Sequence, residues 1–341
     1  MATNGLHVGV VGVGRVGLLH ARTVNGLARV TVVDADPERA RRAADELGVA
    51  IAPTAEGLVE EGVDALVIAT STPGHVPLLE LAAAARVPAF CEKPVALELE
   101  ALDAVSEQVE RAGILVQVGF QRRFDAGFRA ARDAVANGSL GKLLLLRAAT
   151  HDPAPPAGDY VAASGGIFRD LHIHDFDEIR FVTGLEVAEV YADGAVREAP
   201  WFEQYGDVDA AALVLRLADG TLAVVTGARH DALGYDVRLE LFGTRDSVVV
   251  GADERTPLRS LEPGASTSPI RGYRDFLERF EDAYRAELEA FVAAVRQDGS
   301  SPCTLADARA ALAVALAAGR SRAERLPVSI EDVTGAETFA G

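Results

Sequence analysis

The stretch "LHVGVVGVGRVG", residues 6–17, indicates the kind of fold with which the chain begins. Its apolar, largely β-branched start is typical of a buried strand. Gly12, Gly14 and Gly17 then form a G-x-G-x-x-G that follows the strand and opens a helix. Glycines in this order allow a tight turn and the close approach of a pyrophosphate, whose charge then lies on the helix N-terminal amides. The stretch predicts a dinucleotide-binding loop; a glycine turn that binds nothing is the alternative.

An acidic residue stands where a ribose would be bound. Asp34 ends the second strand-like run, 22 positions after Gly12, close to the roughly 20 residues expected for a ribose-binding acid. A carboxylate there accepts hydrogen bonds from the ribose hydroxyls and repels a 2′-phosphate. The sequence therefore favours NAD over NADP, although Asp36 and Arg39 keep NADP open because a nearby arginine can accommodate a phosphate.

The first 120 residues alternate short apolar runs with helical patterns, which is typical of βαβ units and a parallel sheet. We expect a doubly wound Rossmann domain over residues 1–120. The expected strands lie in 6–14, 28–34, 64–70, 87–93 and 114–120, and the expected helices in 15–26, 36–48, 75–86 and 98–112.

The remaining residues, 121–341, have a different pattern and predict a C-terminal α+β domain with an open, mainly antiparallel sheet. Strand-like runs fill 187–250, and "ADG" at 218–220 predicts a hairpin turn. Further expected elements are a helix over 126–136, a strand in 141–151, a Pro-rich loop over 151–160, and helices over 274–297 and 304–323, which we expect to pack back on the first domain.

Composition excludes several classes of function. The chain has 341 residues, 49% of them apolar, and a net charge of −18, which discourages binding to nucleic acid and anionic membranes. Cys91 and Cys303 are too few to suggest a disulfide framework. No leader pattern and no apolar run of about 18 residues is present. We therefore expect a cytoplasmic protein that acts on a small molecule.

Lys93 stands out because it and Lys142 are the two lysines among 33 basic residues. It follows the fifth expected strand in "CEKP", at the edge of the sheet where ligands bind. A lysine can lose its proton when it is desolvated beside another cation, whereas an arginine stays charged. A catalytic amine is therefore favoured over the alternative, a salt bridge at a strand end.

Two further segments carry candidate site residues. In "DLHIHDFDEIRF", a helix would bring Asp170 and His174 together at i and i+4 as a carboxylate-held general base. A strand would instead align Asp170, His172 and His174 as metal ligands, and a structural Asp–His pair is the third alternative. In "STPGHVPLL", His75 is either on the nicotinamide side of a cofactor or a partly exposed surface residue.

Together, "GVVGVGRVGLLHA", "CEKP" and "DLHIHDFD" resemble the Gfo/Idh/MocA family of nicotinamide-dependent oxidoreductases, and further stretches resemble its inositol 2-dehydrogenase branch. The resemblance implies that Lys93, Asp170 and His174 are the catalytic group and that Glu92 supports Lys93. The expected cofactor-binding residues are Gly12, Gly14, Arg15, Val16, Gly17, Asp34, Thr72, His75 and Glu92. The expected substrate-binding residues are Arg122, His151, Tyr235 and Tyr284, with no metal site. Gln121, in place of a frequent methionine, and the loop after His151 depart from the branch and leave the exact polyol open.

The activity implied by this resemblance is the NAD-dependent oxidation of a secondary hydroxyl of a cyclic polyol, with myo-inositol to 2-keto-myo-inositol as the first candidate. The alternatives are a dehydrogenase of an aldose or other sugar, an NAD-dependent glycosidase, and an NAD(H)-binding regulator without catalysis. The resemblance also implies a homo-oligomer, a tetramer or dimer, formed through the open sheet of the second domain.

Overall fold

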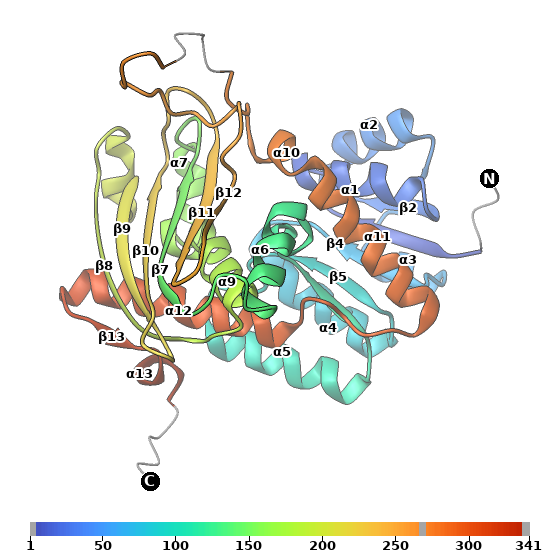
Figure 1. Ribbon diagram of the computed structural model, residues 1–341. Helices are drawn as coiled ribbons and strands as arrows, with labels where there is room; N and C mark the ends of the chain where they lie inside the picture. The colour runs from blue at the N-terminus through green and yellow to red at the C-terminus, as the bar shows by residue number, and fades with distance from the viewer. Residues whose placement is uncertain (1–4, 266–270, 336–341) are drawn as a thin grey trace. The chain divides into compact units, whose positions relative to one another are not determined.

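Six parallel strands form the sheet of the first unit, in the order β3-β2-β1-β4-β5-β6 (Figure 1). The strands are β1 (His7–Val11), β2 (Arg29–Val33), β3 (Ala50–Ile51), β4 (Ala65–Ile68), β5 (Ala89–Glu92) and β6 (Val116–Gly119). Every residue of β1, β4, β5 and β6 is buried, as expected for a parallel sheet covered on both faces. The predicted Rossmann sheet is confirmed.

Helices cover this sheet in two groups. Apolar side chains of α1 and α2 form one buried cluster with residues of β1, β2 and α11, whereas α4 contacts both α3 and α5 (Figure 1). Local signals set the helix ends: Asp36 caps α2, Pro37 is its first residue, and Gly48 ends it in the left-handed conformation. The bounds are α1 (Arg15–Asn25), α2 (Pro37–Leu47), α3 (Ala55–Glu60), α4 (His75–Ala85), α5 (Leu99–Ala112) and α11 (Glu281–Gln297), with short 3-10 turns η1 (Thr72–Gly74) and η2 (Gln121–Phe124).

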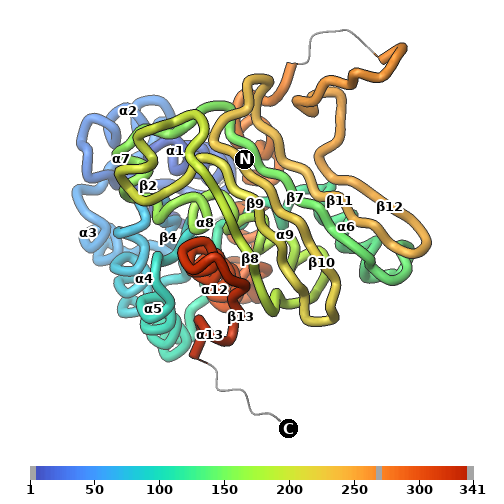
Figure 2. Tube along the Cα trace, turned by 90° about the vertical axis from the view of Figure 1, so that its left-hand side faces the viewer, coloured from blue at the N-terminus to red at the C-terminus, as the bar shows by residue number. Residues whose placement is uncertain are grey.

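The second unit is built on a seven-stranded sheet in the order β12-β11-β7-β10-β9-β8-β13 (Figure 2). β7 and β10 are parallel, and the other neighbouring pairs are antiparallel. Alternate residues of β9 are buried and exposed, so one face of the sheet lies in the core and the other faces solvent in the single chain. The strands are β7 (Leu143–His151), β8 (Val187–Ala195), β9 (Ala210–Leu217), β10 (Leu222–Ala228), β11 (Asp236–Gly243), β12 (Ser247–Val250) and β13 (Val328–Ser329).

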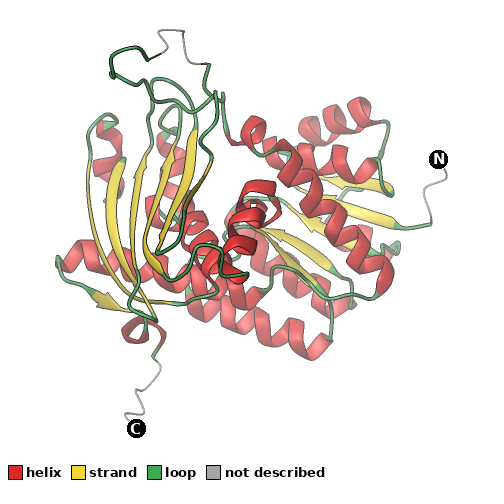
Figure 3. Cartoon of the chain, viewed as in Figure 1, coloured by secondary structure: helices red, strands yellow, loops and turns green. Residues whose placement is uncertain are grey.

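Helices α6 and α9 pack together beside this sheet, and α9 contacts β7 (Figure 3). The predicted loop over 151–160 is wrong at its end, because a helix begins at Gly158; its N-cap, Ala157, makes no side-chain capping bond and gives no sequence signal. The bounds are α6 (Ala126–Ala136), α7 (Gly158–Ser164), α8 (Ile167–Asp170), α9 (Ile173–Thr183), η3 (Pro200–Tyr205), α10 (Phe276–Arg279), α12 (Leu305–Glu324) and α13 (Glu331–Thr334).

The computed structural model describes residues 5–265 and 271–335. It divides into two compact units, Met1–Phe124 with Asp282–Arg309 and Asp125–Glu281 with Ala310–Gly341. Among these described residues, no helix is both long and apolar enough to cross a membrane.

Candidate cofactor and catalytic site

The space around each of the three glycines of the first loop is different. Gly12 has φ +87°, and a Cβ on it would lie 2.7 Å from the Ala69 carbonyl oxygen. A Cβ on Gly17 would collide with the Gly12 carbonyl oxygen. A Cβ on Gly14, in contrast, would meet no protein atom within 4 Å. The fold therefore requires Gly12 and Gly17, whereas Gly14 leaves an open space at the helix N-terminus.

This N-terminus is suited to an anion. Gly14 is the N-cap of α1; it makes no side-chain capping bond, and the first turn has no acidic residue. The first amides of a helix lack intrahelical partners and carry partial positive charge, so they favour a phosphate. Arg15 is exposed and Val16 is half-buried beside them. The loop thus has the shape and the electrostatics that a dinucleotide pyrophosphate requires.

Asp34 stands at the end of β2 and is held by the glycine loop. Its Oδ2 accepts a hydrogen bond from the Val13 N–H at 2.8 Å, and its Oδ1 accepts one from the Asp36 N–H at 2.9 Å. Arg39 Nε donates to Oδ1 at 3.1 Å. Arg39, the arginine that could accommodate the 2′-phosphate of NADP, is therefore ion-paired with Asp34, the candidate ribose-binding residue. The carboxylate stays at the position from which it would exclude a 2′-phosphate.

His75 connects two loops at the carboxyl edge of the sheet. The residue is 1% exposed; its Nδ1 lies 2.8 Å from the Pro94 carbonyl oxygen and its Nε2 lies 3.0 Å from that of Thr70. Burial lowers the pKa of His75, although the two carbonyl contacts act in the opposite direction. The alternative of a partly exposed surface histidine is wrong. Contacts of His75 and of Thr72, in η1, with a cofactor stay predictions.

Glu92 and Lys93 follow one another at the end of β5, and a histidine from α1 fixes the glutamate. His20 Nε2 lies 2.7 Å from Glu92 Oε1, and Oε2 accepts the Lys93 N–H at 3.1 Å. His20 is fully buried and Glu92 is 9% exposed. Because each carboxylate oxygen is bound separately, Glu92 links the helix of the glycine loop to the backbone of Lys93. His20 was not among the predicted site residues.

Two expected substrate residues of this unit are buried. Tyr284, in α11, packs its ring against His20 with 5.8 Å between centroids and is 4% exposed. Arg122, in η2, is 1% exposed. Their contact with a substrate stays a prediction.

The segment that carries Asp170 and His174 is helical, so the alternative in which they share a strand face is wrong. The helix is interrupted, however: Asp170 ends α8, and His174 is the second residue of α9. The His172 N–H bonds to the Ile167 carbonyl oxygen, five residues back, which makes the connecting turn wider than an α-helical one. Asp170 and His174 therefore depart from the ideal i, i+4 relation, and their pairing stays a prediction.

Two residues that the sequence did not indicate hold Asp170. Its Oδ1 accepts a hydrogen bond from the Tyr160 hydroxyl at 2.9 Å, and its Oδ2 accepts one from Arg229 Nη2 at 2.8 Å. Arg229 is 59 positions away in the chain, so no local spacing could have indicated it.

His172 is buried and makes contacts that hold secondary-structure elements together. Its Nδ1 lies 2.7 Å from Asp175 Oδ2, and Asp175 Oδ1 accepts a hydrogen bond from the Thr150 hydroxyl at 2.5 Å. All three residues are fully buried. The ring also fills the space left by Gly227, where a Cβ would collide with it. This histidine therefore fastens α9 to β7 and β10.

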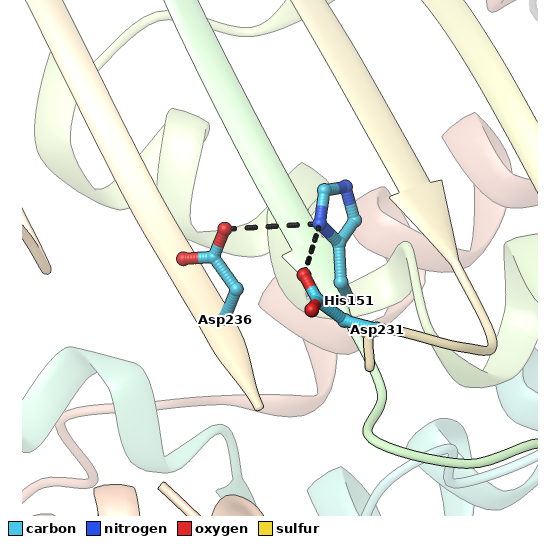
Figure 4. A group of neighbouring side chains, drawn as sticks. All are labelled: His151, Asp231 and Asp236. Atoms are coloured by element: carbon cyan, nitrogen blue, oxygen red, sulfur yellow. Dashed lines mark ion pairs between the residues drawn. The ribbon is translucent and has the colours of Figure 1, made fainter. Parts of the chain in front are cut away.

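His151, the last residue of β7, points between two carboxylates (Figure 4). Its Nδ1 lies 3.6 Å from Asp231 Oδ2 and 3.7 Å from Asp236 Oδ2. The three side chains could hold a cation, but Arg238 already donates to both oxygens of Asp236. Tyr235, next to Asp236, is 5% exposed and packs edge-on against Phe276 and Phe280.

The parallel sheet, the open helix N-terminus and Asp34 define a dinucleotide-binding protein of the Rossmann type. Family models agree with this class: residues 6–120 match "Oxidoreductase family, NAD-binding Rossmann fold", and residues 128–249 match "GFO/IDH/MocA C-terminal domain". The chain belongs to the Gfo/Idh/MocA family of NAD-binding oxidoreductases. The expected family, fold class and cofactor are thereby confirmed.

Several relatives match nearly the whole chain. A myo-inositol 2-dehydrogenase of Thermotoga maritima is 37% identical over 97% of this chain and 100% of its own length. The myo-inositol dehydrogenase Hyg17 of Streptomyces leeuwenhoekii is 40% identical over 92% of this chain and 96% of its own. The crystal structure of a scyllo-inositol dehydrogenase from Lactobacillus casei with NAD(H) and scyllo-inositol has a TM-score of 0.87 at 29% identity, covering 96% and 99% of the two chains.

Proposed function

We propose that the protein is an NAD-dependent dehydrogenase that oxidises a secondary hydroxyl of a cyclic polyol, with myo-inositol to 2-keto-myo-inositol as the first candidate. The observation that carries this proposal is the match, over more than nine-tenths of both chains, to relatives named as inositol dehydrogenases. The open glycine loop and Asp34 support NAD as the cofactor. Because scyllo-inositol dehydrogenases also match, this isomer is the second candidate.

In the proposed mechanism, the His174 imidazole accepts the proton of the substrate hydroxyl, and the Lys93 amino group hydrogen-bonds the same oxygen and lowers its pKa. Asp170 orients the imidazole. When bound, NAD supplies the hydride-accepting chemistry. Glu92, bound by His20 at one oxygen and by the Lys93 N–H at the other, supports this role of Lys93 by fixing its backbone. Arg122, His151, Tyr235 and Tyr284 are the proposed substrate-side residues.

We further propose a cytoplasmic enzyme that assembles as a homo-oligomer, a tetramer or dimer. The solvent-facing side of the second sheet supports the assembly, because it exposes Tyr191, Val214 and Leu222 in a single chain.

The test is a steady-state screen of NADH formation over inositol isomers, aldoses and glycosides, with NAD and with NADP. We expect kcat/KM to be highest for an inositol isomer with NAD. Activity on glucose or xylose without activity on any inositol would refute the proposed substrate. Release of an aglycone without accumulation of NADH would instead identify a glycosidase of the same family.

A further inference from the structure

Arg229 is a buried cation held between two carboxylates in the second unit. It follows β10 directly and is 4% exposed. Its Nη1 donates to Asp152 Oδ2 at 3.0 Å and its Nη2 to Asp170 Oδ2 at 2.8 Å. The two acids come from different elements, since Asp152 follows β7 and Asp170 ends α8. One guanidinium therefore joins the ends of two strands to the helix that carries a proposed catalytic residue.

The arrangement keeps Arg229 charged in spite of its burial. Burial alone would lower the pKa of the guanidinium, but the charges of Asp170 and Asp152 outweigh it and raise the pKa above its usual range. A buried carboxylate needs such a counter-charge, because removal of one partner leaves the other desolvated and unpaired. The Asp170 side chain is 8% exposed, whereas that of Asp152 is 19% exposed. Asp170 is therefore the acid that depends more on Arg229.

Tyr160 fixes the other oxygen of the same carboxylate. Its hydroxyl donates to Asp170 Oδ1 at 2.9 Å. The residue as a whole is 49% exposed, but burial of its hydroxyl end, together with the charge of Asp170, raises the pKa of the hydroxyl. The hydroxyl thus stays protonated and acts as a donor. With Oδ1 bound by Tyr160 and Oδ2 by Arg229, the plane of the carboxylate is set by two directed contacts from different elements.

The backbone around Arg229 is fixed as well. Its N–H bonds to the Asp209 carbonyl oxygen at 2.7 Å, and the Asp152 N–H bonds to the Ala228 carbonyl oxygen at 2.9 Å. The second bond continues the parallel pairing of β7 and β10 beyond their last residues. Backbone hydrogen bonds therefore fix the main chain that carries the Arg229 guanidinium at the end of the sheet.

We propose that Arg229, together with Tyr160, is a positioning residue for the dehydrogenase reaction: it holds the Asp170 carboxylate ionised and in one orientation. This inference rests on the proposed function, in which Asp170 orients His174. It predicts an effect on kcat through Asp170, with no effect on NAD binding, because the Arg229 contacts lie within the second unit. Loss of a purely structural ion pair would lower the free energy of unfolding but would leave the kcat of the folded enzyme unchanged.

The test compares Arg229→Ala, Arg229→Lys and Tyr160→Phe with the wild type, using the polyol that the screen identifies. We expect Arg229→Ala to lower kcat by about 100-fold, as for loss of general-base function, with KM for NAD unchanged. Millimolar guanidinium should restore part of the lost rate. Lysine should restore part of it too, since it supplies the charge without the planar fork. Tyr160→Phe should lower kcat by about fivefold, the loss of one hydrogen bond.

Arg180→Ala is the matched control. Arg180 lies in α9, its side chain is 10% exposed, and it also donates two hydrogen bonds to one carboxylate, that of Glu186. We expect this variant to keep the wild-type kcat and to be insensitive to guanidinium. If Arg229→Ala does not fold, Arg229→Lys and Tyr160→Phe decide the question.

Two outcomes are distinguishable. An active wild type whose Arg229 variants keep a normal kcat, or lose it without rescue by either guanidinium or lysine, overturns the positioning role alone. An inactive wild type that still binds NADH overturns the proposed function, and the inference with it.

Discussion

Lys93 and Lys142 differ in their surroundings although both are lysines in an arginine-rich chain. Lys93 is partly buried at the end of β5, next to the Glu92 carboxylate that His20 holds. Lys142 is exposed before β7. The chemistry that distinguishes lysine from arginine, a proton that can be lost, is useful only where the amine is desolvated and close to a reacting group. At the scale of single residues, the proposed function depends on the Lys93 side chain and on Glu92, whose carboxylate fixes the Lys93 backbone.

Lys93→Arg tests the need for a titratable amine. We expect kcat to fall by at least about tenfold, because arginine keeps the charge but cannot give up its proton at any working pH. NADH affinity, measured by fluorescence titration, should stay within about twofold. Lys142→Arg is the control and should leave kcat unchanged. A fully active Lys93→Arg enzyme would show that charge alone suffices.

His20→Leu tests the buried pair with Glu92. We expect the free energy of unfolding in urea to fall by about 2–3 kcal/mol, because the buried carboxylate loses a partner. His20→Gln, which keeps a donor, should lose less. Arg22→Leu, on the same helix, breaks an exposed pair with Glu46 and should cost less than about 1 kcal/mol. Equal losses for His20→Leu and Arg22→Leu would contradict the assignment.

At the scale of secondary-structure elements, loops that follow different strands contact one another at the carboxyl edge of the parallel sheet. The loop after β1 binds Asp34 at the end of β2, and His75 joins the loop after β4 to that after β5. In sheets of this topology the cofactor lies along that edge. The hydrogen bonds among these loops connect the segments that would contact the cofactor.

Asp34→Ala should weaken selection of the cofactor. The carboxylate that would bind the ribose and repel a 2′-phosphate is lost, so we expect the NAD/NADP ratio of kcat/KM to fall by at least about tenfold. Asp36→Ala is the control: it removes the cap of α2 and an acid two positions away, but it should leave the ratio unchanged. An unaltered ratio in Asp34→Ala would refute the ribose role.

His75 should make stability depend on pH. Its pKa is lowered from 6.5 by burial, so below pH 6.5 the unfolded chain binds a proton that the folded chain binds less readily. The contribution of His75 is therefore complete above pH 6.5 and declines as the pH falls below it, by up to about 1.4 kcal/mol per unit. Urea unfolding at pH 7.5 and 5.5 should show a smaller difference for His75→Asn than for the wild type. An identical difference would contradict this.

At the scale of the whole molecule, the solvent-facing side of the second sheet exposes apolar side chains on neighbouring strands. Tyr191, Val214 and Val224 are in register on β8, β9 and β10, and the first two are 39% and 43% exposed. Side chains in register on neighbouring strands form a continuous row. Such a row is typical of a surface that a second copy covers.

Val214→Asp should therefore shift the molar mass in solution toward the monomer. Light scattering coupled to size-exclusion chromatography measures this directly. Ile51→Asp is the control, because Ile51 is 46% exposed but lies on β3 in the other unit. A wild type that is monomeric at all concentrations would refute the proposed assembly.

Periodicity and glycine spacing predicted the Rossmann strands and the hairpin at 218–220 because these depend on neighbours in the sequence. Contacts between distant segments could not be predicted in this way. The His20–Glu92 pair and the hydrogen bond from Arg229 to Asp170 each depend on residues that the fold brings together from different elements. Local spacing correctly indicated a helix around Asp170 but not the partners of its carboxylate.

The glycine loop has a consequence for how this chain could diverge. A substitution of Gly12 or Gly17 would disrupt the fold, because a Cβ at either position would collide with backbone atoms. Selection for a folded protein alone would therefore remove it. Gly14 is under no such constraint from the protein, since a Cβ on it would meet no atom within 4 Å; the open space is where the pyrophosphate of a dinucleotide would lie. A descendant that had abandoned the cofactor would keep the outer glycines and drift at the middle one. The residue at the middle position of the motif would thus indicate whether binding of the cofactor is still under selection.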